Sequence, residues 1–133
     1  MTEFKTKKGV FATGTDTGVG KTLVAAALAV FLRRRGLDVG VMKPVETGVA
    51  DPGELGNDGR LLKWAAATSD EAGLICPYRL RAPLAPAVAA EKERVFIDCG
   101  QLIETVDLLA ARHDYLIVEG AGGLMTPLNG GIL

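Results

Sequence analysis

Residues suited to phosphate and metal chemistry stand at three separate places in the chain. The first is the segment Gly14–Thr22, in which three glycines precede Lys21 and Thr22. Glycine tolerates positive φ angles, so a glycine-rich loop can bring its N–H groups close to phosphate oxygens. The other two places are Lys43, which follows a short apolar run, and Glu119, which ends another. Together these residue types predict a site for the phosphates of a nucleotide.

The surroundings of the glycine segment support this prediction. The apolar run Val10–Ala12 before it and the apolar stretch Leu23–Leu32 after it predict a strand, a loop and a helix in that order. The helix N-terminus carries partial positive charge, Lys21 can reach the β- and γ-phosphates, and the Thr22 hydroxyl can bind Mg²⁺. The strict pattern has a glycine where this chain has Thr15. An ordinary glycine-rich turn is the alternative, and the flanking strand and helix favour the phosphate site.

Composition limits the classes of protein to consider. A chain of 133 residues suffices for one domain with a hydrophobic core. Its formal net charge of −1 gives no basic excess that would favour nucleic acid. The polar start of the chain lacks the apolar core of a signal peptide, and the run Leu23–Leu32 is too short to cross a bilayer. Cys76 and Cys99 have no partner at metal-ligand spacing, which favours reduced thiols. We expect a cytoplasmic protein without nucleic-acid or membrane partners.

Strands and helices are predicted to alternate along the chain. The expected elements after the first helix are a strand at Asp38–Met42, a mobile surface loop over Pro44–Asn57, a helix from Asn57 or Asp58 to about Ala67, an irregular stretch at Pro77–Pro86, a short helix at Ala87–Glu93, a helix at Leu102–Arg112 with Asp98 and Gln101 as its capping box, and a strand at Tyr115–Val118. Arg33 to Arg35 suit a helix C-terminus, and Gly36 suits the position after it. This order indicates an α/β fold with a parallel sheet flanked by helices.

In open parallel sheets, ligands bind at the carboxyl ends of the strands. The glycine loop, Lys43 and Glu119 therefore converge on one edge of the predicted sheet. Lys43 suits a charge clamp on a transferring phosphoryl group. Glu119 stands where P-loop enzymes hold their metal, and a plain strand-end carboxylate is its alternative. For Asp58, capping a helix and reaching a metal are both open. We expect a capping or surface role for His113.

Several motifs together resemble the dethiobiotin synthetases, and they occur in the same order over nearly the whole chain. The matching segments are Gly14–Thr22, Lys43–Gly48, Asn57-Asp58, Pro83–Pro86, Val118–Gly123 and Thr126–Leu128. In that family, ATP drives closure of 7,8-diaminopelargonate with CO₂ to dethiobiotin through a carbamate that becomes phosphorylated. The resemblance implies a P-loop NTPase-type fold, ATP and Mg²⁺ as cofactors, these two small-molecule substrates and a homodimer.

The resemblance also implies roles for individual residues. The nucleotide-binding positions would be Gly18, Val19, Gly20, Lys21, Thr22, Leu23, Asp58, Glu119, Gly120, Ala121 and Gly122. The metal positions would be Thr22, Asp58 and Glu119. Lys21 and Lys43 would be catalytic, because they would neutralise charge on the carbamate and on the transferring phosphate. Thr47 and Thr17 would contact the substrate. Gly18 stands where relatives have a glutamate, so any contact of that carboxylate is missing.

Members of this family are considerably longer than 133 residues. We therefore expect residues 1–133 to be the N-terminal portion of a single P-loop ATP-binding domain that is incomplete at Leu133. The later strands, the base contacts and the seat of the substrate tail would lie beyond it.

Two alternative classes share the phosphate loop. One is a partition-type P-loop ATPase switch, which carries a lysine early in the loop where this chain has Asp16. The other is a cobyrinate-type amide synthetase, which also activates a carboxyl group by phosphorylation. The segment Lys43–Gly48 and the pair Asn57-Asp58 favour the dethiobiotin synthetases over both.

Overall fold

The computed structural model describes residues 8–18 and 20–130, and a parallel sheet is at the centre of its fold. Its strands are β1 (Gly9–Ala12), β2 (Val39–Met42) and β5 (Tyr115–Glu119), in the spatial order β1-β5-β2. All three are apolar runs, which is typical of strands in a parallel sheet. β2 and β5 are mostly buried, whereas β1 at the edge is largely exposed. The predicted parallel α/β sheet is confirmed.

The register of the sheet aligns the carboxyl ends of the strands. Ala12 of β1 pairs with Glu119 of β5, and Met42 of β2 pairs with Val118. The glycine loop after β1, Lys43 after β2 and the end of β5 therefore lie at one edge of the sheet. This is the edge on which the sequence predicted that they would meet.

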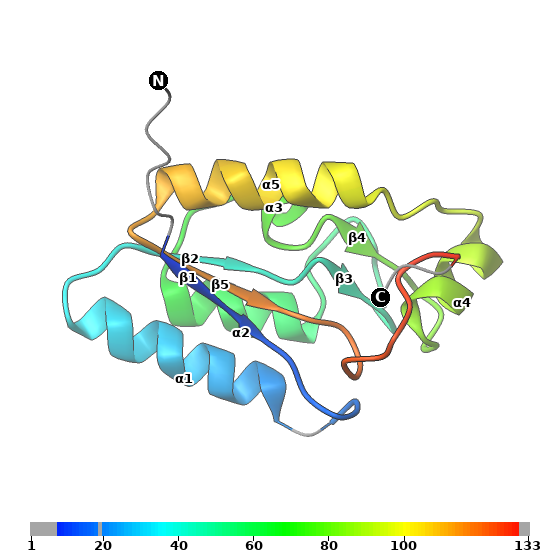
Figure 1. Ribbon diagram of the computed structural model, residues 1–133, viewed down its shortest axis with the longest axis horizontal. Coiled ribbons are helices and arrows are strands. Elements are labelled where there is room, and N and C mark those ends of the chain that lie inside the picture. The colour runs from blue at the N-terminus through cyan, green and yellow to red at the C-terminus, as the bar shows by residue number, and fades with distance from the viewer. Residues whose placement is uncertain (1–7, 19, 131–133) are drawn as a thin grey trace.

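Helices cover both faces of the sheet. Helices α1 (Lys21–Arg34) and α2 (Asn57–Ala66) lie together on one face, and α5 (Cys99–Arg112) lies on the other (Figure 1). Helix α1 begins two residues before the predicted apolar stretch. Gly36, just past its C-terminus, has a φ of 86°, which fits the glycine predicted there.

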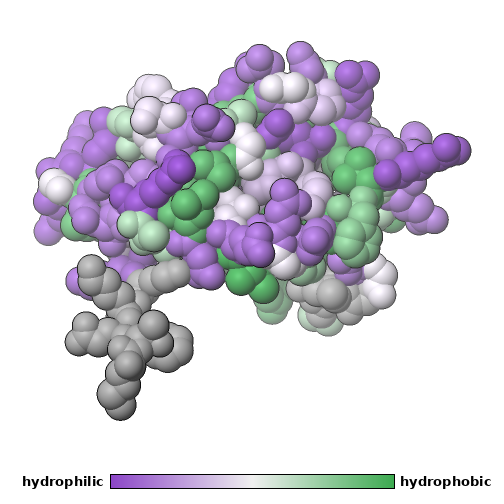
Figure 2. All heavy atoms as spheres, turned by 90° about the horizontal axis from the view of Figure 1, so that it is seen from above, coloured by the Kyte–Doolittle hydropathy of each residue, from purple (hydrophilic) through white to green (hydrophobic). Residues whose placement is uncertain are grey.

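Two clusters of buried side chains hold these layers together. Between the sheet and α1 and α2 the cluster includes Ala25, Ala26, Ala29, Val39, Val41, Leu62, Ala65, Ile75 and Ile117. The small side chains of α1 let this helix approach the sheet closely. Between the sheet and α5 the cluster includes Met42, Val45, Leu80, Ala89, Ile97, Leu102, Leu109, Leu116 and Val118. Seen from the α5 side, the surface is mostly hydrophilic with a few separate hydrophobic patches (Figure 2).

The capping of α5 is confirmed in part. The Asp98 carboxylate accepts hydrogen bonds from the N–H groups of Gly100 and Gln101, at 2.8 and 3.4 Å. The reciprocal half of the box runs through Tyr78. Its hydroxyl accepts the Asp98 N–H at 3.0 Å and donates to the Gln101 side chain at 2.7 Å. The box is therefore a three-residue relay rather than a direct pair.

The prediction of a mobile surface loop over Pro44–Asn57 is wrong. Its first part is β3 (Val45–Glu46), which pairs in parallel with β4 (Tyr78–Arg79), inside the stretch predicted to be irregular. Val45, Glu46, Val49 and Leu55 are all buried. Strands of two residues carry no alternation pattern that a sequence window can detect.

Two further helices complete the described part of the chain. Helix α3 (Ala72–Ile75), which the sequence did not predict, follows α2, and α4 (Pro86–Glu93) begins one residue before its predicted start. Pro86 is in the first turn of α4, where its missing N–H costs nothing. Among the described residues no helix is both long and apolar enough to cross a membrane.

His113 is the C-cap residue of α5, as one of its two predicted roles required, but its side chain is not on the surface. Its side chain is 8% exposed, with Nδ1 2.9 Å from Asp38 Oδ1 and Nε2 2.6 Å from Asp70 Oδ2. Burial favours the neutral ring, but the hydrogen bonds and charges of Asp38 and Asp70 outweigh it and raise the pKa of His113 above 6.5. Gly40 lies against this ring, and a Cβ at that position would be only 2.9 Å from His113 Cγ. The imidazole thus ties the amino ends of β2 and β5 to Asp70.

The two cysteines fit the prediction of free thiols. Cys76 is buried and Cys99 is half-buried. Burial raises the pKa of the Cys76 thiol to about 12, so this side chain stays protonated and unreactive at neutral pH.

Candidate functional site

The loop between β1 and α1 has the backbone shape that phosphate binding requires. Gly18 and Gly20 have φ angles of 76° and 95°, in the left-handed region that favours glycine. Lys21 is the first residue of α1, and its Nζ donates to the main-chain oxygen of Asp16 at 2.7 Å. The lysine is thus folded onto its own loop and is 9% exposed. Val19 lies outside the described residues.

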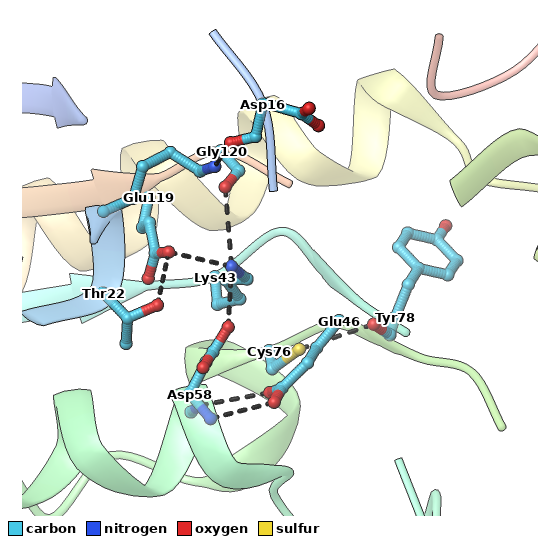
Figure 3. A network of polar contacts seen from close by, with 11 residues as sticks. Asp16, Thr22, Lys43, Glu46, Asp58, Cys76, Tyr78, Glu119 and Gly120 are labelled. Carbon is cyan, nitrogen blue, oxygen red and sulfur yellow. Dashed lines mark hydrogen bonds and ion pairs between the residues drawn. The ribbon is translucent and has the colours of Figure 1, made fainter. Parts of the chain in front are cut away.

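Glu119 is at the centre of a network of polar contacts at the carboxyl ends of the strands (Figure 3). Its Oε1 accepts hydrogen bonds from the Thr22 hydroxyl at 2.7 Å and from Lys43 Nζ at 2.9 Å. Its side chain is 1% exposed. Its Oε2 has no hydrogen-bond partner among the described residues. A buried carboxylate oxygen without a partner is costly, so this atom marks a place for a cation or a donor.

Lys43 joins Glu119 to α2. Its Nζ lies 3.0 Å from Asp58 Oδ2 and 3.5 Å from the main-chain oxygen of Gly120. Burial favours the neutral amine, but the charge and hydrogen bond of Glu119, followed by those of Asp58, raise the pKa of Lys43 above 10.5. Lys43 therefore stays an ammonium over the physiological range, between two carboxylates and at the mouth of the phosphate loop.

The donors beside Lys43 fit Mg²⁺ in part. Mg²⁺ is commonly held by one or two carboxylates together with water and substrate phosphates. The Thr22 hydroxyl and the unpartnered Oε2 of Glu119 supply hard oxygen donors of this kind. Asp58 lies on the other side of the Lys43 ammonium. No group of three or more His, Cys, Asp or Glu side chains in the described ranges converges as a complete protein cage.

The structure corrects the predicted capping of α2. The N-cap is Gly56, and neither Asn57 nor Asp58 caps this helix with its side chain. Instead, the carboxylate of Glu46 accepts the N–H groups of Asp58 and Gly59, at 2.9 and 3.1 Å. The Asp58 side chain is thereby left free for Lys43.

The glycine turn after β5 packs onto the phosphate loop. Gly120 donates its N–H to the main-chain oxygen of Ala12 at 2.9 Å, and Leu124 donates its N–H to the main-chain oxygen of Gly14 at 2.9 Å. A Cβ at Gly123 would lie 2.6 Å from the main-chain oxygen of Thr15. Only glycine allows the two loops to approach this closely.

Not all of the predicted residues join this network. Leu23 is 69% exposed on α1, and Ala121 and Gly122 lie half-buried in the turn after β5. Thr17 is exposed, and its N–H is held by the Asp16 side chain at 2.7 Å. Thr47 is half-buried just after β3. In the described part of the chain, no hydrogen bond links either threonine to Lys43 or Glu119.

Two hollows lie near these elements. A small one of about 140 Å³ is at the phosphate loop, beside Thr13, Gly20 and Lys21. A larger one of about 810 Å³ lies between β1 and α5, and its lining is mainly apolar. The small hollow has the chemistry of the predicted site, whereas the large one is a gap in the covering of the sheet.

The sequence reasoning gave no role to Glu46 or Gly56. Glu46 lies within the segment Lys43–Gly48 that carried the family resemblance. Its contact with the N–H groups of Asp58 and Gly59 forms only when the start of α2 packs against the end of β3. A carboxylate directly after a buried valine, followed by glycines at the start of a predicted helix, is the signal that indicates this contact.

The sheet order, the glycine loop and the threonine and acidic residue beside it define an α/β protein of the P-loop NTPase type. The family model described as "AAA domain" matches residues 8–133, and the chain belongs to this family.

The chain is also similar to curated proteins named "ATP-dependent dethiobiotin synthetase BioD". That of Anaeromyxobacter sp. (strain Fw109-5) is 50% identical over 121 residues, which are 91% of this chain and 53% of the relative. That of Thermodesulfovibrio yellowstonii is 45% identical over 92% of this chain and 52% of the relative. That of Methanocaldococcus jannaschii is 39% identical over 90% of this chain and 55% of the relative. The chain spans about half the length of the curated relatives it matches.

Proposed function

We propose that the protein containing this chain is an ATP- and Mg²⁺-dependent dethiobiotin synthetase. It closes 7,8-diaminopelargonate with CO₂ into the cyclic urea of dethiobiotin. The names of the relatives at 39 to 50% identity support the reaction, and the motifs quoted from the sequence support the substrates.

The observation that carries this proposal is the position of Lys43. A buried ammonium lies between two carboxylates, and one of them is hydrogen-bonded to the threonine that follows the phosphate-loop lysine. A fixed positive charge at this point suits a phosphoryl transfer, in which charge spreads over the phosphate oxygens. An apolar binding module would have no need of such a buried charge.

Each residue then has a defined task. Gly18, Val19, Gly20 and Leu23, with the turn Gly120–Gly122, would surround the nucleotide. Thr22, Glu119 and Asp58 would hold Mg²⁺, which neutralises charge on the phosphates. Lys21 would exchange the Asp16 oxygen for a phosphate oxygen. Lys43 would stabilise the carbamate and the transferring group, and the hydroxyls of Thr47 and Thr17 would hydrogen-bond the substrate.

The proposed reaction has three steps, which are carbamate formation, phosphorylation of the carbamate and ring closure. One amine of the substrate adds to CO₂ and loses a proton, which gives a carbamate. ATP supplies the phosphoryl group that converts a carbamate oxygen into a leaving group, and ADP is released. The second amine attacks the carbamate carbon, the C–O bond to phosphate breaks, and loss of a proton from that nitrogen completes the ring.

The remaining parts of the proposal concern the whole protein. We infer a cytoplasmic homodimer that binds neither nucleic acid nor membranes. Residues 1–133 would be the N-terminal portion of a longer P-loop ATP-binding domain. The half-length coverage of the relatives supports this last inference.

The test is ATP consumption by the full-length protein, measured with and without 7,8-diaminopelargonate and bicarbonate. The synthetase requires both for full turnover and forms one dethiobiotin per ADP. Full-rate ATP hydrolysis without the diamine would contradict the proposal and favour a switch ATPase. Turnover that requires an amide-nitrogen donor and a large carboxylic acid would favour an amide synthetase.

A further inference from the structure

Glu46 is a buried carboxylate without a role in the proposed nucleotide, metal or substrate sites. It ends β3, it is 7% exposed, and it points toward the first turn of α2 (Figure 3). Its two oxygens accept from two successive main-chain N–H groups, Oε1 from Asp58 at 2.9 Å and Oε2 from Gly59 at 3.1 Å. A carboxylate at a helix N-terminus is also stabilised by the helix dipole.

Gly56 makes room for this carboxylate, because a Cβ at that position would lie 2.5 Å from Glu46 Cδ. A Cβ at Gly59 would lie 3.4 Å from Oε2, which is an ordinary contact. Gly56 has a φ of −73°, which any residue can adopt. Its lack of a side chain is therefore explained by the space that Glu46 occupies and not by backbone strain.

The arginine paired with Glu46 makes its hydrogen bonds to other residues. Arg79 pairs with Glu46 across β3 and β4, but its guanidinium donates to the main-chain oxygens of Pro52, Ala72 and Cys76. The carboxylate of Glu46 is thus held by the helix N–H groups of α2. Since these belong to Asp58 and Gly59, the orientation of Glu46 and the position of Asp58 depend on each other.

Asp58 in turn lies on Lys43, with Oδ2 3.0 Å from Nζ. The contacts form one chain that runs from Glu46 to the main chain of Asp58, to Lys43, and to Glu119. We propose that Glu46 is a positioning residue, which fixes Asp58 against Lys43 by clamping the first turn of α2. This inference rests on the proposed function, because it assigns to Glu46 an effect on the step that Lys43 serves.

A simple helix cap would stabilise α2 without affecting turnover. The clamp differs because its two N–H groups include that of the residue whose side chain touches Lys43. A displacement of about 1 Å at a catalytic group can cost on the order of 100-fold in rate. Helix capping at a site without such a link has no comparable effect.

The test uses Glu46→Gln in the full-length protein, with Asp98→Ala as the matched control. The substituted amide keeps the shape of the side chain, but its nitrogen faces one of the two N–H groups and cannot accept from it. Asp98→Ala removes an N-cap of similar geometry from α5, which does not contact Lys43. We expect Glu46→Gln to lower kcat about 10- to 100-fold with KM for ATP nearly unchanged. Asp98→Ala should lower Tm with kcat unchanged.

A double variant separates positioning from an independent effect. In an Asp58→Asn background, adding Glu46→Gln should lower kcat by less than about twofold further, because the two residues act as one unit. Gly56→Ala, which displaces the carboxylate and keeps its charge, should lower kcat in the same direction as Glu46→Gln. A folded Glu46→Gln protein with wild-type kcat would overturn the inference, and so would full additivity with Asp58→Asn. If the wild type itself makes no dethiobiotin, it is the proposed function that fails.

Discussion

The free energy of unfolding should depend strongly on the Lys43 ammonium, even without a nucleotide. Lys43→Met removes this charge and keeps most of the apolar stem. The side chains of Lys43 and Glu119 are 6% and 1% exposed, and their charged atoms lie 2.9 Å apart. Breaking a buried pair of this kind by removing one partner costs about 3–5 kcal/mol, because the other charge stays buried.

The two ion pairs of Lys43 should contribute very differently. The Asp58 side chain is 39% exposed, so solvent screens its share, and exposed pairs contribute about 0–1 kcal/mol. Asp58→Asn should therefore cost less than about 1 kcal/mol, whereas Lys43→Met should cost several times more. Glu119 dominates this difference.

Urea denaturation of the full-length protein in a metal-free buffer measures these costs. The double variant Lys43→Met with Glu119→Gln should regain most of the stability lost in Lys43→Met, because the amide removes the unpaired charge and can still accept from Thr22. A cost below about 1 kcal/mol for Lys43→Met would refute the reasoning, as would additive losses in the double variant. Either result would mean that Lys43 is solvated and does not hold a buried pair.

The remaining predictions concern three other features. Lys21→Ala should abolish ATP binding in calorimetric titration with little change in apo stability; equal binding and turnover in the variant would contradict the phosphate site. The raised pKa of His113 should contribute stability that is complete below pH 6.5 and is lost as the pH rises through the folded pKa, and unfolding of His113→Gln by urea should lack this fall. An unchanged pH profile in His113→Gln would contradict it. Light scattering and a product assay should show that a 1–133 fragment aggregates and makes no dethiobiotin, whereas the full-length protein is a soluble homodimer; a monodisperse, active fragment would show that the fold is complete as it stands.

The parts of the fold that the sequence predicted depend on local patterns. The strands were recognisable as apolar runs, and the rule for parallel sheets was enough to bring Lys43, Glu119 and the glycine loop to one edge. Helix α1 followed from its apolar stretch and from the basic residues and glycine at its end. None of these inferences needed a contact between distant side chains.

The errors all involve partners that are distant in the sequence. Glu46 holds α2 from 12 or 13 residues away, and His113 finds Asp38 and Asp70 at separations of 75 and 43 residues. The pairing of β3 with β4 spans only two residues on each side. Neither a helical nor a strand period in the sequence indicates these contacts, since they form only when the layers of the fold pack together.

The position of β5 has a consequence for the order in which this protein forms. Among the described residues, β5 is the last strand of this sheet in sequence order, and it lies between β1 and β2, with Gly9 paired to Leu116. During synthesis, β1 and β2 cannot pair into this sheet until β5 has been made, because each of them pairs with β5 and not with the other. Closing a loop of this length costs entropy before any strand contact is gained. Thr22, Lys43 and Glu119 therefore meet only after β5 has paired with both β1 and β2, so a nucleotide can stabilise the assembled site but cannot guide the steps before that pairing.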